Sequence, residues 1–362
     1  MDKPIYKLTD DGYGIHTFEI KIIALDPDEY KLLKNRLFEK GAMYDRNRKN
    51  VIIAKTEKYS GIRIKLHKNF VSYLEVIINP WTLLNHQNAP LRIMSAKEND
   101  PAKLKAELNK QLSFYLGDEF GLERFQLTRI DCTATFMFAD PSMTAKYLDL
   151  IKRSIKIGKG SVIKCWNATS EEDVRNQMAH SFQVNFYETK FTAYDKLYEI
   201  QRRDKDFSIE SGLLRIELAF NNIKISAISK ELNIRDIIEQ VTFFCDNSDT
   251  LMRKFINFRF PYGDYYSCES AKRIIDASDL QKKSRNNILE HLWKHCLYDD
   301  YDSYNRETKR RLKTEMRYRT LKNNLRDYGI NFIPIPKWDK SVDRLPGMYS
   351  LFGITEEEYE DE

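Results

Sequence analysis

The sequence predicts an α+β fold, in which a mostly antiparallel central sheet carries flanking helices and a helical domain follows. Two observations carry this prediction. Short segments that alternate apolar and polar residues recur through the first 220 residues, between longer segments with apolar residues at helical spacing. After residue 220 the pattern is almost entirely helical. We therefore expect an α+β domain over 1–220, a helical domain over 221–345 and an acidic, disordered tail over 346–362.

Alternation with period two identifies the strands, because successive strand side chains point to opposite faces of a sheet. The expected strands are 14–25, 50–55, 61–67, 72–80, 125–138, 180–191 and 212–220. Two of them share a local pattern, T-R-I-D-C-T at 128–133 and L-R-I-E-L-A at 214–219. Each pattern places one carboxylate between apolar neighbours, which is consistent with two related halves.

The early helices begin at Asp-Pro pairs, a combination of N-cap and first-turn residue that favours helix starts. In the first of them, Asp26 or Asp28 is the expected N-cap and Gly41 the stop; in the second, Pro101 lies in the first turn and Gly117 follows the end. The expected helices are 26–41, 100–117, 140–160, 222–241 with a break at Asn233, 270–280, 282–298 and 305–329. Two prolines then predict an extended path over 330–338.

Composition narrows the function classes. Apolar residues make up 42% and charged residues 31% of the 362 residues, and no run of eighteen apolar residues occurs, so we expect a globular protein without a membrane span. The N-terminus lacks the pattern of a secretory signal. The five cysteines are scattered and form no C-x-x-C pair, which favours a cytoplasmic location and argues against a disulfide framework or a cysteine-rich zinc site.

Charge is distributed unevenly along the chain. The net charge is +5, yet residues 356–362 alone carry six negative charges. Residues 306–326 hold nine Lys or Arg against two Glu, which predicts a polyanionic partner, most simply DNA; a solvated helix surface would give the same composition. The residues expected to contact phosphates are Arg306, Lys309, Arg310, Lys313 and Arg317.

Carboxylates at strand centres need a partner, because burying an unpaired charge is unfavourable. Asp131 and Glu217 occupy such positions, Glu75 is a third strand carboxylate, and His67 ends the preceding strand. Mg²⁺ or Mn²⁺ takes carboxylate oxygens, so these four residues are candidate metal ligands. The alternative is that each carboxylate forms a salt bridge with a neighbouring Arg or Lys, or is exposed.

The segment K-F-T-A-Y-D-K-L-Y-E at 190–199 places Tyr194 at a strand end, two residues before Lys196. A phenol can attack a phosphodiester, but its pKa near 10 means that it needs activation. Lys196 could lower the pKa of that phenol or hold a phosphate oxygen. Since the chain has 21 tyrosines, a packing role is the competing interpretation. No G-x-x-x-x-G-K-[ST], G-x-G-x-x-G or G-x-S-x-G motif occurs, so nucleotide-driven catalysis is not expected.

The order R-I-D, then Y-D-K-x-x-E, then L-R-I-E resembles the replication initiation proteins of phages and rolling-circle plasmids. It is similar to the filamentous-phage gene II/X replication proteins and their plasmid relatives in low-GC Gram-positive bacteria. Further matching segments are Y-L-E-V-I-I-N-P at 73–80, F-P-Y-G-D-Y-Y-S at 260–267 and L-R-D-Y-G-I-N at 325–331. The resemblance spans roughly residues 15 to 335; each motif is short, and their order is the stronger signal.

The resemblance implies a cytoplasmic enzyme that nicks and rejoins one DNA strand at an origin through a phosphotyrosyl intermediate with Mg²⁺ or Mn²⁺. Carried over by position, Tyr194 is the nucleophile with Lys196 and Glu199 in its motif, and Asp131 and Glu217 are the strand carboxylates. The His-hydrophobe-His metal motif of the wider nicking superfamily is absent, and His67 or Glu75 stands on the corresponding strand. The rival tyrosines are Tyr187, Tyr198, Tyr265 and Tyr266.

Two function hypotheses follow. The first is the replication initiator just described, bound to single-stranded DNA or an origin hairpin, with a host helicase and a homodimer as further expected partners and no membrane. Tyr265, Tyr266 and Trp293 could stack on its bases. The second is a non-catalytic DNA-binding protein on the same scaffold, acting as an origin-recognition factor or repressor. If the carboxylates converge near a tyrosine, the replication initiator is favoured. If each carboxylate forms its own ion pair with Arg or Lys, the non-catalytic DNA-binding protein is favoured.

Overall fold

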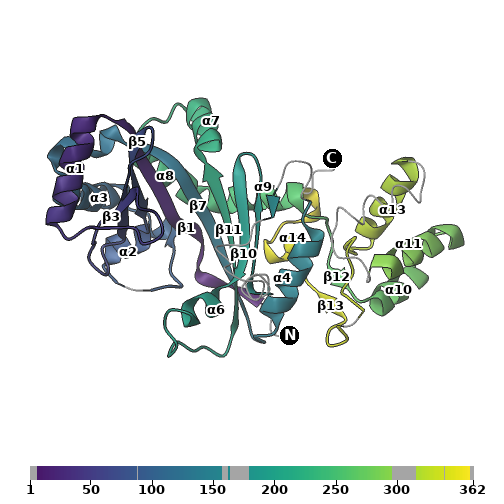
Figure 1. Ribbon diagram of the computed structural model, residues 1–362. Coiled ribbons are helices and arrows are strands. Elements are labelled where there is room, and N and C mark those ends of the chain that lie inside the picture. The colour runs from purple at the N-terminus through teal and green to yellow at the C-terminus, as the bar shows by residue number, and fades with distance from the viewer. Residues whose placement is uncertain are drawn as a thin grey trace.

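The computed structural model describes residues 6–87, 89–156, 162–163, 179–295, 315–337 and 339–358. These residues form a large antiparallel sheet of eleven strands with flanking helices, which confirms the predicted α+β fold class. The strands are hydrogen-bonded in the order β2-β3-β4-β5-β1-β7-β11-β10-β9-β8, and β6 pairs with β1. Figure 1 shows α10, α11 and α13 gathered at one end of the molecule, apart from this sheet.

The sheet strands are β1 (Tyr6–Leu25), β2 (Met43–Tyr44), β3 (Val51–Ile53), β4 (Ile62–His67), β5 (Ser72–Ile78), β6 (Met94–Ser95), β7 (Gln126–Phe138), β8 (Val162–Ile163), β9 (Ser181–Asn185), β10 (Thr189–Asp195) and β11 (Gly212–Asn221); β12 (Tyr265–Tyr266) and β13 (Arg344–Leu345) form a second, two-stranded sheet. The helices are α1 (Pro27–Glu39), α2 (Pro80–Asn85), α3 (Pro101–Leu116), α4 (Met143–Ser154), α6 (Lys196–Gln201), α7 (Asn222–Leu232), α8 (Ile237–Asp246), α9 (Ser248–Arg259), α10 (Cys268–Asp276), α11 (Lys282–His295), α13 (Glu315–Asp327) and α14 (Met348–Leu351).

The two faces of the sheet differ in chemistry because the strand residues alternate. One face is apolar and buried, with residues such as Phe18, Ile130 and Ile216, and the helices pack on it. The other face, which we call the polar face, carries charged and hydroxyl side chains on β4, β5, β1, β7, β11 and β10. The candidate catalytic and metal residues Asp131 and Glu217 both lie on this polar face, in neighbouring rows of the β7–β11 pairing.

Local sequence signals account for the helix starts. The Asp26 side chain caps α1 by accepting from the backbone N–H groups of Asp28 and Glu29, and Pro27 opens the helix, as predicted. Asp100 caps α3 in the same way. The break predicted at Asn233 is also present, because Asn233 takes a left-handed backbone conformation that ends α7.

The segment 180–191, predicted as one strand, is a hairpin instead. The strands β9 and β10 pair antiparallel around a turn at residues 186–188, and the Phe186 N–H donates to the Thr189 carbonyl at 2.8 Å. The turn holds no Gly, Pro, Asn or Asp, so the sequence offers no signal for it. This hairpin places Tyr194 opposite Ser181 on one side and opposite Arg215 on the other.

The predicted domain boundary at residue 220 does not match the packing. Helices α7, α8 and α9 bury residues such as Ile225, Val241 and Ile256 in the same core as the sheet. A second, smaller core begins with Cys268 on α10 and includes residues of α11, α13 and the segment that follows it. The helical region therefore divides between two cores, and its first three helices belong to the sheet.

The predicted disordered tail is ordered over much of its described part. Tyr349 and Phe352 are buried in the sheet core, and the Tyr349 hydroxyl donates to the Asn257 carbonyl at 2.9 Å. Further along, Glu358 forms an ion pair with Arg253 at 2.6 Å. The apolar residues at 348–354, which precede the acidic run, explain the difference, because they gain more from burial than the ordering of the chain costs.

The cysteines depart from expectation at one position. Cys132 and Cys245 are free and buried, but Cys268 is part of a disulfide whose other half lies outside the described residues. Among the helices of the described ranges, none has the length and apolar character needed to cross a membrane.

Candidate active site

Tyr194 and Glu217 meet on the polar face. The Tyr194 hydroxyl donates to Oε1 of Glu217 at 2.8 Å, and the same oxygen lies 3.2 Å from Nδ1 of His16. The strand register produces the first contact: Tyr194 on β10 pairs with Arg215 on β11, so Glu217 is its diagonal neighbour on the same face. The side chains of His16 and Glu217 are 22% and 16% exposed, so a substrate can reach them.

His16 reaches this site because β1 contains a bulge. The register of β1 against β7 passes from the pair Ile15–Cys132 directly to the pair Thr17–Asp131, which leaves His16 as an extra residue. A bulge changes the direction of the extra side chain, and here it places the His16 ring beside Glu217. The sequence prediction did not include His16, since one unpaired residue inside an alternating strand gives no signal of its own.

The charges around Glu217 keep its carboxyl ionised. Burial alone would raise the pKa of the Glu217 carboxyl, but the hydrogen bond and charge of His16, the charge of Arg215 and the bond from Tyr194 hold it well below its usual range. Burial and the negative charge of Glu217 raise the pKa of the Tyr194 phenol well above its usual range, and Arg215 opposes this rise. At neutral pH the pair is a phenol that donates to a carboxylate.

Lys196 lies at the start of α6, directly after the strand that carries Tyr194. Its ammonium is buried, donates to Oε2 of Glu199 at 2.6 Å and lies 5.8 Å from the centre of the Tyr194 ring. Burial and the charge of Arg215 lower the pKa of Lys196 to about 8, although Glu199 opposes the shift. The Asp195 side chain caps α6 by accepting from the Tyr198 N–H at 3.0 Å, which fixes where Lys196 points.

Arg215 is fully buried beneath this site. Its guanidinium donates to the Thr135 hydroxyl at 2.9 Å and to the carbonyls of Leu91 at 2.6 Å and Pro90 at 3.4 Å. These three acceptors are neutral, so the positive charge acts on Tyr194 and Glu217 rather than on a dedicated ion pair. The sequence prediction treated this arginine only as part of the L-R-I-E motif.

The other predicted metal ligands do not join Glu217. Both carboxylate oxygens of Asp131 accept from Arg129, at 3.0 and 2.9 Å, and one also accepts from Thr17. Glu75 lies between Lys65 at 2.6 Å and Lys21 at 3.4 Å, with Nε2 of His67 at 3.7 Å.

Across the described ranges, no group of three or more His, Cys, Asp or Glu side chains could hold a metal ion. The four predicted ligands therefore do not form one site. Mg²⁺ often needs only one or two protein carboxylates beside phosphate oxygens and water, and Glu217 supplies one carboxylate of that kind.

The rival tyrosines differ in access. Tyr265 is buried, its hydroxyl lies 2.9 Å from the Ser154 hydroxyl, and burial raises its pKa, so it cannot meet a DNA strand in this conformation. Tyr187 is 80% exposed at the turn between β9 and β10. Tyr198 stacks on the His180 ring at 3.7 Å. Tyr266 is half-buried and lies under the Arg344 guanidinium.

The predicted phosphate-binding run falls mostly beyond what the structure describes. Arg306, Lys309, Arg310 and Lys313 lie outside the described residues, and for Arg317 only the backbone position within α13 is described. Trp293, a candidate for base stacking, is 38% exposed on α11, and the Lys337 ammonium lies 5.4 Å from its ring.

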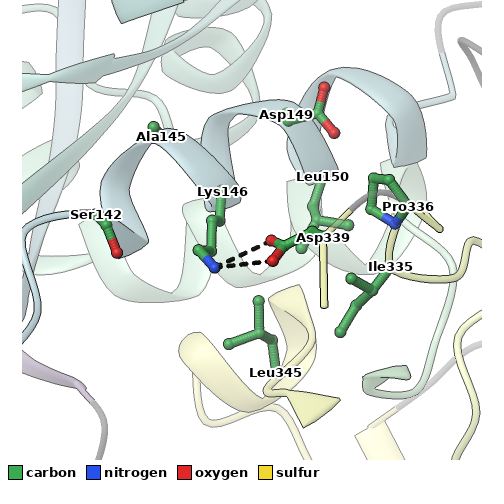
Figure 2. Close-up of a pocket in the computed structure, with 9 residues that line it drawn as sticks. All are labelled: Ser142, Ala145, Lys146, Asp149, Leu150, Ile335, Pro336, Asp339 and Leu345. Atoms are coloured by element: carbon green, nitrogen blue, oxygen red, sulfur yellow. Dashed lines mark hydrogen bonds and ion pairs between the residues drawn. The ribbon is translucent and has the colours of Figure 1, made fainter. Parts of the chain in front are cut away.

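A cavity of about 400 Å³ lies elsewhere, between α4 and residues 335–345. Figure 2 shows Lys146 of α4 reaching Asp339 across it, with N–O distances of 3.0 and 3.1 Å, and apolar side chains such as Leu150 and Ile335 around the pair. None of the candidate catalytic residues lines this cavity. The candidate site lies instead on the polar face of the sheet, where the side chains of His16 and Glu217 are partly exposed.

No protein-family model and no curated protein sequence matches the chain. Among solved structures, the chain is similar to a rolling circle replication initiator protein from Geobacillus stearothermophilus, with 9% sequence identity and a TM-score of 0.32 over 80% of this chain and 99% of that chain. At this TM-score the similarity assigns no activity, so the function is argued from the site itself.

Proposed function

We propose that the protein starts DNA replication by nicking one strand at an origin, with Tyr194 as the nucleophile. The observation that carries this proposal is the chain of contacts from the Tyr194 hydroxyl to Glu217 and on to His16, on an accessible face of the sheet. A phenol that already donates to a carboxylate has an acceptor for its proton at the moment of attack.

In the proposed reaction the phenolic oxygen of Tyr194 attacks a DNA phosphorus atom. The tyrosyl O–P bond forms while the P–O3′ bond breaks, and Glu217 takes the phenolic proton. The released 3′ oxygen takes a proton from solvent and becomes the 3′-OH that primes synthesis. Rejoining is the reverse, with a 3′-OH as the attacking group.

Proton transfer from Tyr194 to Glu217 is unfavourable in the resting site, since the pKa values of the two groups lie far apart. It becomes favourable as the phenolic oxygen bonds to phosphorus, because an ester oxygen is far less basic than a phenolate. The positive charges of Arg215 and of the nearby Lys196 stabilise negative charge that develops on that oxygen.

We also propose that a divalent cation takes part. Glu217 would hold Mg²⁺ or Mn²⁺ together with phosphate oxygens of the DNA, and His16 would orient the Glu217 carboxylate. When bound, the ion would supply positive charge to the phosphate under attack. A host helicase and a second copy of the chain stay predictions from the family resemblance.

The second candidate function, a non-catalytic DNA-binding protein, is favoured by a different observation. Asp131 and Glu75 are each held by Arg or Lys side chains, as structural carboxylates are. On this reading the polar face is a stable charged surface, and the Tyr194–Glu217 contact is one more hydrogen bond within it.

A nicking assay separates the two functions. Single-stranded oligonucleotides from the replicon that encodes the protein would be incubated with Mn²⁺ or Mg²⁺ and resolved on a denaturing gel. The wild type is expected to give a covalent protein–DNA adduct that the Tyr194→Phe variant does not form. Tyr187→Phe, at an exposed turn, serves as the matched control and should keep the adduct.

Other outcomes are equally informative. An adduct that survives Tyr194→Phe but is lost in Tyr198→Phe would keep the enzyme class and move the nucleophile. Tight DNA binding by the wild type without any adduct, on either origin strand, would contradict nicking and favour the non-catalytic function.

A further inference from the structure

Two loops at the β3–β4 side of the sheet form one exposed unit, which we call the basic tip. It consists of residues 45–50, between β2 and β3, and residues 68–71, between β4 and β5. The Lys68 N–H donates to the Asn50 carbonyl at 2.8 Å, and the Asn50 side-chain amide donates to Oδ1 of Asn69 at 2.6 Å. These bonds continue the pairing of Val51 with His67, so the two loops are joined side by side.

The basic tip concentrates positive charge. It carries four exposed cations against one acid, and these cations are Arg46, Arg48, Lys49 and Lys68. The acid, Asp45, accepts from the Asn47 N–H at 2.8 Å and from the Arg48 guanidinium at 3.3 Å, which orders the turn and neutralises that one charge. The remaining cations face solvent and suit a polyanion.

Phe70 stands among these cations at the apex of the β4–β5 turn. Its side chain is fully exposed, at 106% of the reference area, and its neighbour Val71 is 46% exposed. An aromatic ring that is accessible on both faces and flanked by cations can stack on an unpaired base, whereas bases in a duplex are already stacked on one another. The combination of charges and ring therefore fits single-stranded nucleic acid better than duplex.

We infer that the basic tip binds single-stranded DNA at a site separate from Tyr194. The strand order places β3 six steps from β10, which is about 29 Å across the sheet at ~4.8 Å per strand. Figure 1 shows β3 and α6 in well-separated parts of the molecule. A strand engaged at both places would cross the polar face. The inference depends on the proposed function in one respect: that function identifies the polyanion as DNA.

The test is the binding of a fluorescent oligothymidylate of about 16 nucleotides, followed by anisotropy over a range of salt concentrations. This probe carries no origin, so binding is measured without nicking. One variant removes three cations of the basic tip and a second removes the ring. The variants are Arg46→Gln/Arg48→Gln/Lys49→Gln and Phe70→Ala.

Matched controls remove the same number of charges and one phenyl ring from α1 and α3, which pack on the opposite, apolar face. All four positions are exposed, and Phe114 is 57% exposed. The control variants are Lys31→Gln/Lys103→Gln/Lys110→Gln and Phe114→Ala. Both are expected to bind within about twofold of the wild type.

The triple variant of the basic tip is expected to bind more weakly and to lower the slope of log K against log salt by about 2, at roughly 0.7 per phosphate contact. Phe70→Ala is expected to weaken binding about fivefold or more. Tip variants that bind like their controls would overturn the inference. Equal losses with a duplex of the same length would overturn the preference for single strands.

The inference and the proposed function can fail independently. If origin oligonucleotides form the Tyr194 adduct while the tip variants bind normally, the basic tip is not a DNA site and the nicking function stands. If the tip variants lose binding but no adduct forms with any origin strand, the DNA site stands and the nicking function falls.

Discussion

Lys196 carries a buried positive charge, which is unfavourable for folding. The residue is 3% exposed, and Glu199 is the acid that pairs with its ammonium. Burial and the charge of Arg215 lower its pKa from 10.5 to about 8. Below pH 8 the native and unfolded states are both protonated at this site, so the native state carries the full penalty, on the order of 3 kcal/mol. Between pH 8 and 10.5 the unfolded chain binds more protons, so this group makes stability rise with pH.

We expect Lys196→Met to be more stable than the wild type at pH 7, by up to about 3 kcal/mol, because it removes the buried charge and keeps the volume. The difference should shrink as the pH approaches 10.5. Urea unfolding at several pH values between 7 and 10.5 measures it. Arg203→Gln, which removes the exposed partner of Glu199, is the control and should change stability by less than about 0.5 kcal/mol at every pH. A destabilised Lys196→Met at pH 7 would contradict the assignment of the penalty to Lys196.

At the scale of the strands, the polar face is an alternating series of charges. The series runs from β4 to β7. Lys65 pairs with Glu75, and Lys21 lies between Glu75 and Glu19. Arg129 pairs with Asp131 and approaches Glu19 at 3.7 Å. Neighbouring opposite charges remove most of the repulsion that a row of strand acids would create. Glu217 ends this row with His16 and Tyr194 as its neighbours, which is why we assign it the chemical role.

This assignment predicts how the strand carboxylates differ in metal binding. In a calorimetric Mn²⁺ titration with a bound oligonucleotide, in the Tyr194→Phe background so that no nicking occurs, Glu217→Gln should weaken Mn²⁺ binding at least tenfold, because it removes the carboxylate that would hold the ion. Asp131→Asn should bind Mn²⁺ like the wild type and instead lose about 1–2 kcal/mol of stability, since Arg129, about a third exposed, loses its nearer carboxylate and retains only Glu19 at 3.7 Å. Loss of Mn²⁺ binding in Asp131→Asn would restore Asp131 as a ligand.

The elements also show what the sequence could predict. Alternation located the long strands, and the Asp-Pro starts located α1 and α3, because both signals act over a few residues. The partners of Asp131 and Glu217 depend on register between strands far apart in sequence, where one residue changes the face of every side chain. The bulge at His16 is such a one-residue event, so the sequence did not indicate His16, whereas the local motifs did indicate Tyr194 and Glu217 as candidates.

At the scale of the whole molecule, the chain leaves the sheet core and returns to it. After α9 it builds the second core, and residues 335–354 then pack back on the first core with Ile335, Leu345 and Phe352. The chain therefore passes between the two cores twice, once after α9 and once before residue 335. The sequence suggested consecutive domains because helical periodicity does not tell which core a helix joins.

The Asp264 side chain holds part of this returning segment, residues 344–350, in place. Its Oδ1 accepts from the Gly347 N–H at 2.7 Å and the Ser350 hydroxyl at 2.8 Å, and its Oδ2 accepts from the Arg344 guanidinium at 2.6 Å. Its backbone accepts from the Asn331 N–H at 2.8 Å. The largely buried Asp264 carboxylate therefore ties the start of β12 to the segment 344–350, and the Asp264 backbone ties it to the segment that follows α13.

We expect Asp264→Ala to lower the free energy of unfolding by about 3 kcal/mol, because the Gly347 N–H loses a charged acceptor in a buried place and two further bonds are lost with it. Asp343→Ala is the matched control: Asp343 is next to the same arginine in sequence, its side chain is 74% exposed, and its ion pair with Arg273 spans 3.5 Å, so a change within about 0.5 kcal/mol is expected. Chemical denaturation gives both values, and limited proteolysis reports whether residues 344–358 detach first. If the return path is held mainly by its buried apolar residues, the two variants will unfold alike, and Asp264 will have no special part in joining the cores.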